Sequence, residues 1–91
     1  WIFVFLYWTF ALTKVSSMVI SIFGKVLREQ RELKKLSQEK LAELCDLDRT
    51  YISLLERGLR QPTISTLFKI ADALDLSPSD VVKKVEMAIK K

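Results

Sequence analysis

The sequence predicts an all-α fold of five helices, and three observations support this prediction. Apolar residues recur at intervals of three and four from about residue 20 onward, a spacing that places them on one face of a helix. Residues suited to cap helices, Ser37, Asp48, Thr63 and Ser77, stand where this periodicity restarts. No alternating strand pattern or internal repeat occurs between residues 18 and 91. The chain has 91 residues, 49% of them hydrophobic, which suits one compact helical domain small enough to favour dimerisation.

The first predicted helix of this domain runs from near Ile20 or Phe23 to Lys34. Charged residues such as Arg28 and Glu32 are expected on its outer face. The residues expected on its inner face are Phe23, Val26, Leu27 and Leu33.

Two short helices are predicted next, because Ser37 and Asp48 can each cap a helix and stand close together in the chain. Asp46 lies in the turn between these helices, where aspartate tolerates a positive φ better than most residues. The apolar stripes are Leu41, Leu44 and Cys45 in the first of the two helices, and Ile52 and Leu55 in the second. Since the second stripe is so narrow, the outer face of that helix is free to contact another molecule.

The fourth helix follows Thr63, and the fifth follows Ser77, with Pro78 at its first position and Asp80 at its third. The residues expected to make the fourth helix mostly core are Ile64, Leu67, Phe68, Ala71 and Leu74. The apolar stripe of the fifth helix consists of Val81, Val82, Val85 and Ile89. These four exceed what closing the core obviously requires, so some could form a self-complementary dimer patch; the alternative is that all four pack inward.

Composition restricts the possible functions. The net charge of +4 is compatible with a polyanionic partner. Cys45 is the single cysteine and the chain has no histidine, which excludes an intrachain disulfide and the familiar zinc clusters and histidine-based triads. We therefore expect no metal, no cofactor, no small-molecule ligand and no enzymatic activity, because no nucleophile, base and orienting group occur together.

A resemblance can be identified from Leu36 to Gly58, where the chain reads L-S-Q-E-K-L-A-E-L-C-D-L-D-R-T-Y-I-S-L-L-E-R-G. This segment resembles the helix-turn-helix of the XRE/Cro/CI group, the lambda-repressor-like DNA-binding domains, and the resemblance extends from about Val26 to Val85. It implies a five-helix lambda-repressor-like fold and a sequence-specific transcriptional regulator that binds double-stranded DNA as a homodimer. Such a regulator reads an inverted-repeat operator through the major groove with its third helix, as a repressor or an activator.

Part of the same segment indicates which subgroup of this family the chain resembles. The run D-R-T-Y-I-S resembles controller proteins of restriction-modification systems, although phage-type repressors and antitoxins share similar helices. An alternative function is a protein-interaction module, either an antitoxin or a membrane-complex component, in which DNA binding is secondary.

Candidate DNA contacts follow from exposure on the third helix and from the resemblance. The residues predicted to contact bases are Arg49, Thr50 and Ser53, which share one side of that helix. The alternative for Arg49 is a solvated side chain paired with Asp46 or Asp48. The residues predicted to contact phosphates are Gln38, Lys40, Tyr51, Arg57 and Arg60, and ordinary surface charge is the alternative for each. The resemblance further implies a structural ion pair between Arg31 and Glu56.

Residues 1–17 form an apolar leader ahead of the DNA-binding domain at residues 18–91. Through Phe23 its only charge is Lys14, so a membrane segment within residues 1–23 is physically possible, with the domain held in the cytoplasm at the inner membrane. We favour an upstream, non-native extension, because the chain starts at Trp1 and Met18 begins a normal-looking first helix. A third alternative is an apolar arm that packs in a dimer. The expected location is cytoplasmic.

Overall fold

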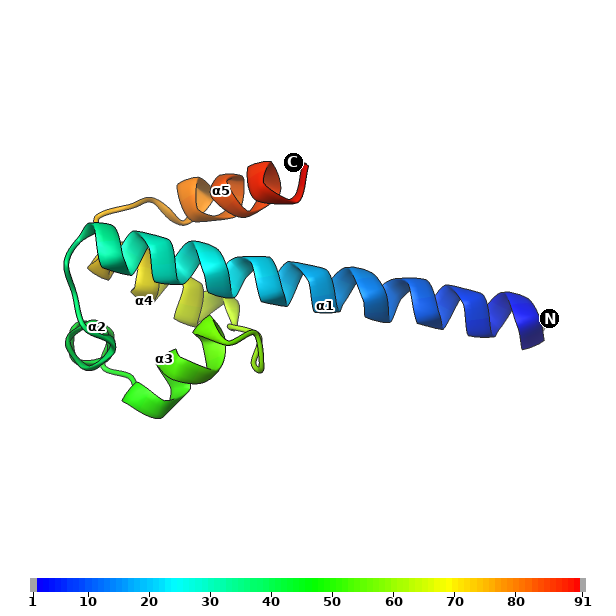
Figure 1. The fold of residues 1–91 in the computed structure, drawn as a ribbon, viewed down its shortest axis with the longest axis horizontal. Coiled ribbons are helices and arrows are strands. Elements are labelled where there is room, and N and C mark those ends of the chain that lie inside the picture. The colour runs from blue at the N-terminus through cyan, green and yellow to red at the C-terminus, as the bar shows by residue number, and fades with distance from the viewer. Residues whose placement is uncertain (1, 91) are drawn as a thin grey trace.

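The fold was examined in a computed structural model that describes the chain from residue 2 to residue 90, with the side chains of residue 2 and residues 15–90. Within this range the chain forms five α-helices and no strand, so the all-α prediction is confirmed (Figure 1). The helices are α1 (Ile2–Leu33), α2 (Gln38–Cys45), α3 (Arg49–Glu56), α4 (Ile64–Ala73) and α5 (Pro78–Lys90). The helices α2 to α5 gather around the C-terminal half of α1, while the N-terminal half of α1 extends away from them (Figure 1).

The start of α1 differs from the prediction. The first helix was expected to begin near Ile20 or Phe23, but α1 begins at Ile2 and continues without interruption to Leu33. The physical reason is that residues 2–19 contain neither proline nor glycine, so nothing in the sequence ends a helix there. The proposed division between residues 17 and 18 falls inside this helix and stays a prediction.

Most side chains of the apolar leader, residues 1–17, lie outside the part of the structure that is described. Its residues 3–14 carry most of the apolar run that made a membrane segment conceivable, and their side chains are not part of the description. Within the part of the chain that the structure describes, no helix combines the length and the apolarity needed to cross a membrane.

Side-chain caps begin the four shorter helices as predicted. The bonds run from the backbone N–H of Lys40 to Ser37 (3.0 Å), of Thr50 to Asp48 (2.7 Å), of Thr66 to Thr63 (3.1 Å) and of Asp80 to Ser77 (3.1 Å). Each satisfies a backbone donor that has no partner inside its helix. Asp46 adopts φ 55°, the left-handed conformation expected at the turn between α2 and α3.

One hydrophobic core receives side chains from all five helices. Its innermost large members are Leu27, Leu41, Ile52, Leu55, Ile70 and Leu74. Burying each such side chain stabilises the fold by about 1.5–3 kcal/mol relative to leaving it exposed. Two of these residues, Ile52 and Leu55, fix the inner side of α3 against the core, and this sets the direction in which the other side of α3 faces.

Several residues predicted to lie in the core are instead exposed. These predictions were wrong for Leu33, Leu44, Ile64 and Phe68. The inward face of α4 is centred on Leu67, Ile70 and Ala71 and continues to Leu74 just after the helix, so Ile64 and Phe68 lie outside its edge. Ile70, which the sequence analysis did not place inside, is fully buried.

Gly24 determines how closely α1 approaches α3. A Cβ atom built at this position would lie 2.5 Å from the carbonyl oxygen of Leu55 and 2.6 Å from that of Glu56. Both atoms belong to the backbone at the end of α3, which cannot yield as a flexible side chain would. Only glycine therefore allows this contact between the two helices.

Replacing Gly24 with Ala is expected to lower the free energy of unfolding by about 1–3 kcal/mol, because overpacking outweighs the gain of about 0.5–1 kcal/mol that alanine normally brings to a helix interior. Urea denaturation followed by circular dichroism measures the change. Ser17→Ala, at an exposed position of the same helix, is the control. A more stable Gly24→Ala variant would show that α1 does not approach α3 this closely.

Candidate nucleic-acid interface

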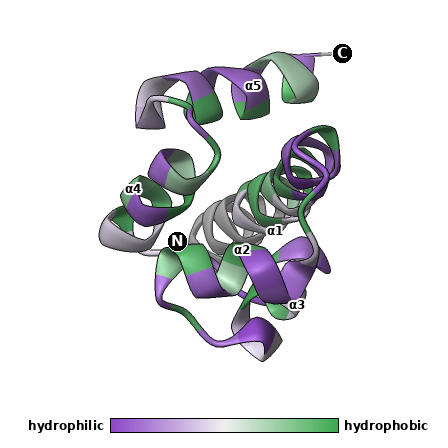
Figure 2. Cartoon of the chain, turned by 90° about the vertical axis from the view of Figure 1, so that its left-hand side faces the viewer, coloured by the Kyte–Doolittle hydropathy of each residue, from purple (hydrophilic) through white to green (hydrophobic). Residues whose placement is uncertain are grey.

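The first turn of α3 is open to solvent on its outer face. Its inner side is anchored by Ile52 and Leu55, both 0% exposed, and its first turn is fixed by the cap from Asp48. Its first two residues, Arg49 and Thr50, are exposed, and the helix begins with hydrophilic residues (Figure 2). A rigid helix with one exposed polar side is the geometry required for entering the major groove of DNA.

The three residues predicted to contact bases lie on this helix at its exposed end. Arg49 and Thr50 are exposed, and Ser53 is half-buried one turn later. Among the ion pairs of the described residues, none joins Arg49 to Asp46 or Asp48, and the Asp48 carboxylate accepts the Thr50 N–H. The Arg49 guanidinium therefore keeps its donors available.

The five residues predicted to contact phosphates lie around the outer face of α3, and they differ in exposure and in their hydrogen-bond or ion-pair partners. Arg57 and Arg60 are exposed just after α3, and Tyr51 is half-buried against the core. Lys40 is exposed in the first turn of α2, with its ammonium 3.5 Å from a carboxylate oxygen of Glu43. Gln38 lies beside the end of α3, because its side chain reaches Glu56.

The predicted ion pair between Arg31 and Glu56 is present and joins α1 to α3. The Nε of Arg31 donates to one carboxylate oxygen at 2.6 Å, and Nη2 donates to the other at 3.0 Å. Their side chains are only 11% and 3% exposed. The hydrogen bond to Glu56 raises the pKa of the Arg31 guanidinium, although burial opposes this shift. This bidentate geometry restrains both side chains more tightly than a single hydrogen bond would.

The ion pair extends to α2 through two further hydrogen bonds. The Nη1 of Arg31 donates to the carbonyl oxygen of Leu36 at 2.8 Å, just before α2. The side-chain amide of Gln38 donates to Glu56 at 3.1 Å. From the sequence, Gln38 was predicted only to contact phosphate, and this second role was not predicted. Because one carboxylate holds Arg31 and Gln38 together, the start of α2 is fixed relative to the end of α3.

Two glycines that sequence reasoning did not use also position α3. Gly24 allows α1 to pack against the last turn, as described above. Gly58 follows α3 with φ 73°, and a Cβ there would lie 3.2 Å from the Cα of Ser21. The available signals were a glycine inside a helical pattern and another immediately after a predicted helix end.

Most of the residues proposed for a dimer patch on α5 face inward in this structure. Val81 and Val85 are buried, and Ile89 packs against the core, so these three follow the alternative that they face inward. The exception is Val82, which is 53% exposed. The stripe of α5 therefore closes the domain rather than presenting a free apolar face.

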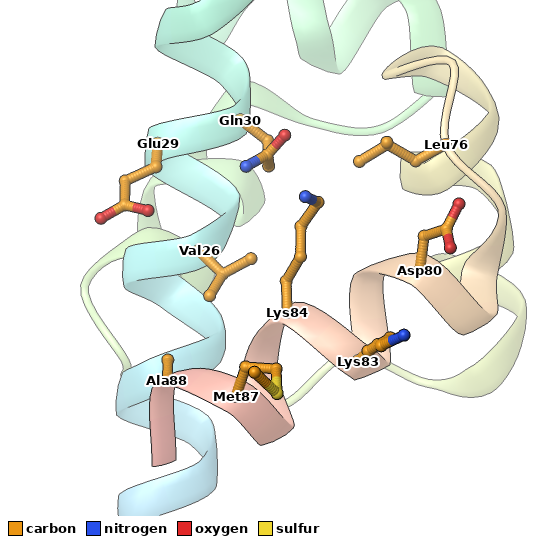
Figure 3. Close-up of a pocket in the computed structure, with 9 residues that line it drawn as sticks. All are labelled: Val26, Glu29, Gln30, Leu76, Asp80, Lys83, Lys84, Met87 and Ala88. Atoms are coloured by element: carbon orange, nitrogen blue, oxygen red, sulfur yellow. The ribbon is translucent and has the colours of Figure 1, made fainter. Parts of the chain in front are cut away.

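Two further features of the described structure lie away from α3. Cys45 is buried, its Sγ lies 3.8 Å from the carbonyl oxygen of Lys69, and burial raises the pKa of its thiol, which disfavours the reactive thiolate. A cavity of about 630 Å³ lies between α1 and α5, with Lys84 and Gln30 among its lining residues (Figure 3). None of the residues lining it belongs to α2 or α3, so it is separate from the candidate interface.

Comparisons with known proteins agree with this geometry. The helix-turn-helix family model matches residues 27–81. The chain is 47% identical to the control protein C.BamHI of Bacillus amyloliquefaciens over 62 residues, which cover 67% of this chain and 76% of the relative. It is 46% identical to the control protein C.SmaI of Serratia marcescens over 56 residues, 62% of this chain and 67% of that protein.

Solved structures include similar folds. The restriction-modification controller protein C.AhdI from Aeromonas hydrophila matches with a TM-score of 0.67 and 45% identity, covering 68% of this chain and 94% of that one. The controller protein C.Esp1396I, solved as a tetramer with its natural 35-base-pair operator, matches with a TM-score of 0.74 and 36% identity, covering 80% of this chain and 96% of that one. On the family match, the sequence identity and the shared fold, this chain belongs to the XRE-type helix-turn-helix family.

Proposed function

We propose that this chain is a sequence-specific DNA-binding transcriptional regulator that reads its operator with α3 in the major groove. The observation that carries the proposal is the first turn of α3, where Arg49 and Thr50 stand exposed on a helix whose other side is locked into the core. The similarity to control proteins of restriction-modification systems supports a role in that class.

Base recognition is assigned to Arg49, Thr50 and Ser53. A guanidinium can donate two hydrogen bonds to the O6 and N7 atoms of guanine, and each such pair contributes about 1–3 kcal/mol of discrimination. The hydroxyl of Thr50 can bond to a base edge, or its methyl group can contact the methyl of thymine. Ser53 lies one turn along the same side and completes the contact surface.

Phosphate contacts are assigned to the residues around α3 and the start of α2. They set the position of α3 on the duplex without reading sequence. The set consists of Gln38, Lys40, Tyr51, Arg57 and Arg60. Free backbone N–H groups at the start of α2 add to the attraction of an anion, and the Gln38–Glu56 bond holds this helix end in place.

The regulator acts as a homodimer without catalysis, metal or cofactor. Two copies related by a twofold axis would place their α3 helices about 34–36 Å apart, in successive major grooves of an inverted repeat. A similar protein, C.Esp1396I, binds its operator as a tetramer. Occupying the operator would then block or recruit RNA polymerase, in the cytoplasm where the DNA is found.

Selection of bound fragments from random DNA, using the full chain at two salt concentrations, tests this function. We expect one enriched inverted repeat whose recovery persists at the higher salt concentration, because base contacts add to the salt-sensitive phosphate contacts. Recovery of random fragments at both concentrations would contradict it and would favour the protein-interaction module.

Removing the charges of Arg57 and Arg60 is expected to reduce the salt dependence of operator binding. The slope of log K against log salt should become shallower by about 0.9 for each phosphate that the variant no longer neutralises, while the order of preferred sequences stays the same. Arg57→Gln and Arg60→Gln, titrated by fluorescence anisotropy, measure this slope. Arg28→Gln is the control, because Arg28 is also exposed to solvent but pairs with Glu32 on α1. An unchanged slope would place Arg57 and Arg60 away from the phosphates.

A further inference from the structure

The cavity of about 630 Å³ between α1 and α5 has the size of a small-molecule site. Ligand-binding clefts in proteins usually enclose about 300–1,000 Å³. Its walls come from α1, from Leu76 in the loop before α5, and from α5 itself (Figure 3). It shares no lining residue with a smaller apolar groove of about 290 Å³ that is bordered by α4. We call it the α1–α5 cavity.

The floor of the α1–α5 cavity is apolar. Val26 of α1 is only 5% exposed, and Leu76 and Ala88 pack against the core while remaining partly open. Met87 adds an apolar wall on α5 and is 55% exposed. Covering such surface removes it from water, which is favourable. The cavity therefore suits a ligand with an apolar body.

Two hydrogen-bond donors face each other across this cavity, the ammonium of Lys84 on α5 and the side-chain amide of Gln30 on α1. Figure 3 shows the end of the Lys84 side chain directed toward Gln30. Among the described residues, no ion pair includes Lys84. Within the same part of the chain, no hydrogen bond engages the side-chain amide of Gln30. One charged and one neutral donor suit an anionic oxygen group.

The acidic residues of the α1–α5 cavity limit the charge of that group. Glu29 and Asp80 line the cavity together with Lys83 and Lys84, so its formal charges balance. A phosphate monoester carries between one and two negative charges at neutral pH, and both carboxylates would repel it. A carboxylate carries a single charge and needs only one ammonium to balance it. The charge balance therefore favours a carboxylate over a phosphate.

We propose that the α1–α5 cavity binds a small organic carboxylate with an apolar body. Lys84 and Gln30 bind the carboxylate group, and the apolar body lies against Val26, Leu76 and Met87. The sequence-based expectation was that no small-molecule ligand binds, because these residues come from opposite ends of the domain and meet only in the folded chain. The proposal does not depend on the proposed function, since no lining residue belongs to α2 or α3.

Octanoate and octanol are matched probes, because their chains are equally long and only octanoate is charged. Isothermal titration calorimetry of the full chain, at octanoate concentrations too low for micelles, measures both dissociation constants. We expect octanoate to bind at one site about tenfold more tightly than octanol, since hydrogen bonds to a charged group are stronger than neutral ones. Equal affinity for the two probes, or the absence of saturable octanoate binding, would overturn the proposal.

Two substitutions assign the binding to this cavity. Lys84→Gln should weaken octanoate binding about tenfold, to the level of octanol, and leave octanol binding unchanged. Met87→Glu places a carboxylate on the exposed apolar wall and should weaken octanoate binding at least as much. The control is Lys69→Gln, at an exposed lysine of α4 that does not line the cavity. Circular dichroism checks that every variant keeps its helices. Unchanged octanoate binding in Lys84→Gln, or an equal loss in Lys69→Gln, would contradict the assignment.

Backbone amide chemical shifts in NMR spectra of the full chain locate the bound octanoate. The largest changes should fall on residues 26–30 and 83–88, which contain most of the lining residues. Changes that are largest at residues 61–67, which border the smaller apolar groove, would place octanoate there and overturn the proposal.

Discussion

Arg49→Ala is expected to weaken operator binding by about 2–6 kcal/mol per dimer, since each of the two guanidinium groups contributes about 1–3 kcal/mol to the choice of base. The loss should concentrate on one guanine in each half-site, so the variant should tolerate other bases there. The fold should not change, because Arg49 is exposed and caps no helix.

Fluorescence anisotropy with the selected operator, and with the same operator altered at that guanine, measures this effect. For the wild type the alteration should be costly, and for Arg49→Ala it should make almost no difference. Arg28→Ala, which removes an exposed arginine on α1, is the matched control for loss of charge. An equal loss of affinity on both DNA sequences would mean that Arg49 contacts phosphate instead.

Arg31→Ala is expected to lower the free energy of unfolding by about 3–5 kcal/mol, because it leaves the Glu56 carboxylate buried without its charged partner. That carboxylate would keep only the amide of Gln38 among the bonds described here. The free energy of unfolding of a small domain is low. This variant should therefore be largely unfolded near the melting temperature of the wild type. Thermal and urea denaturation followed by circular dichroism measure the loss.

Two comparisons make this test specific. Arg28→Ala breaks the exposed Arg28–Glu32 pair, which should matter by less than about 1 kcal/mol. The double variant Arg31→Met with Glu56→Leu removes both charges and should recover much of the stability. A loss below about 1 kcal/mol for Arg31→Ala alone would show that the pair is solvated rather than buried.

The pH dependence of this effect follows from the raised pKa of Arg31. A cation whose pKa is raised by folding contributes its stabilisation below the unfolded pKa and loses it as pH rises through the folded pKa. For arginine that loss lies above the usable range of pH. The contribution of the Arg31 guanidinium should therefore be constant across neutral and moderately alkaline pH.

Local features of this fold were predictable from the sequence because short-range chemistry determines them. The caps at Ser37, Asp48, Thr63 and Ser77 depend on one side chain and a backbone N–H three or fewer residues away. The positive φ of Asp46 follows in the same way from the turn between two closely spaced helices. The Arg31–Glu56 pair joins residues far apart in sequence, and it was accessible only through the resemblance to a known family.

The features that sequence reasoning missed depend on packing between helices. The spacing of Ile64 and Phe68 is correct for a buried stripe, and only the packing of α4 against its neighbours shows that the inward face lies on the Leu67 and Ile70 side. The need for glycine at position 24 becomes clear only from its contact with the backbone at the end of α3. Likewise, the second role of Gln38 requires the position of Glu56 in space.

Methylation interference on the selected operator tests most directly whether the outer face of α3 reads bases. Methyl groups at guanine N7 lie in the major groove, and those at adenine N3 lie in the minor groove. We expect N7 methylation to block binding at symmetric positions in two half-sites about one helical turn apart, and Arg49→Ala to lose this sensitivity. Interference that is confined to the minor groove, or that is equal for the wild type and Arg49→Ala, would contradict the account.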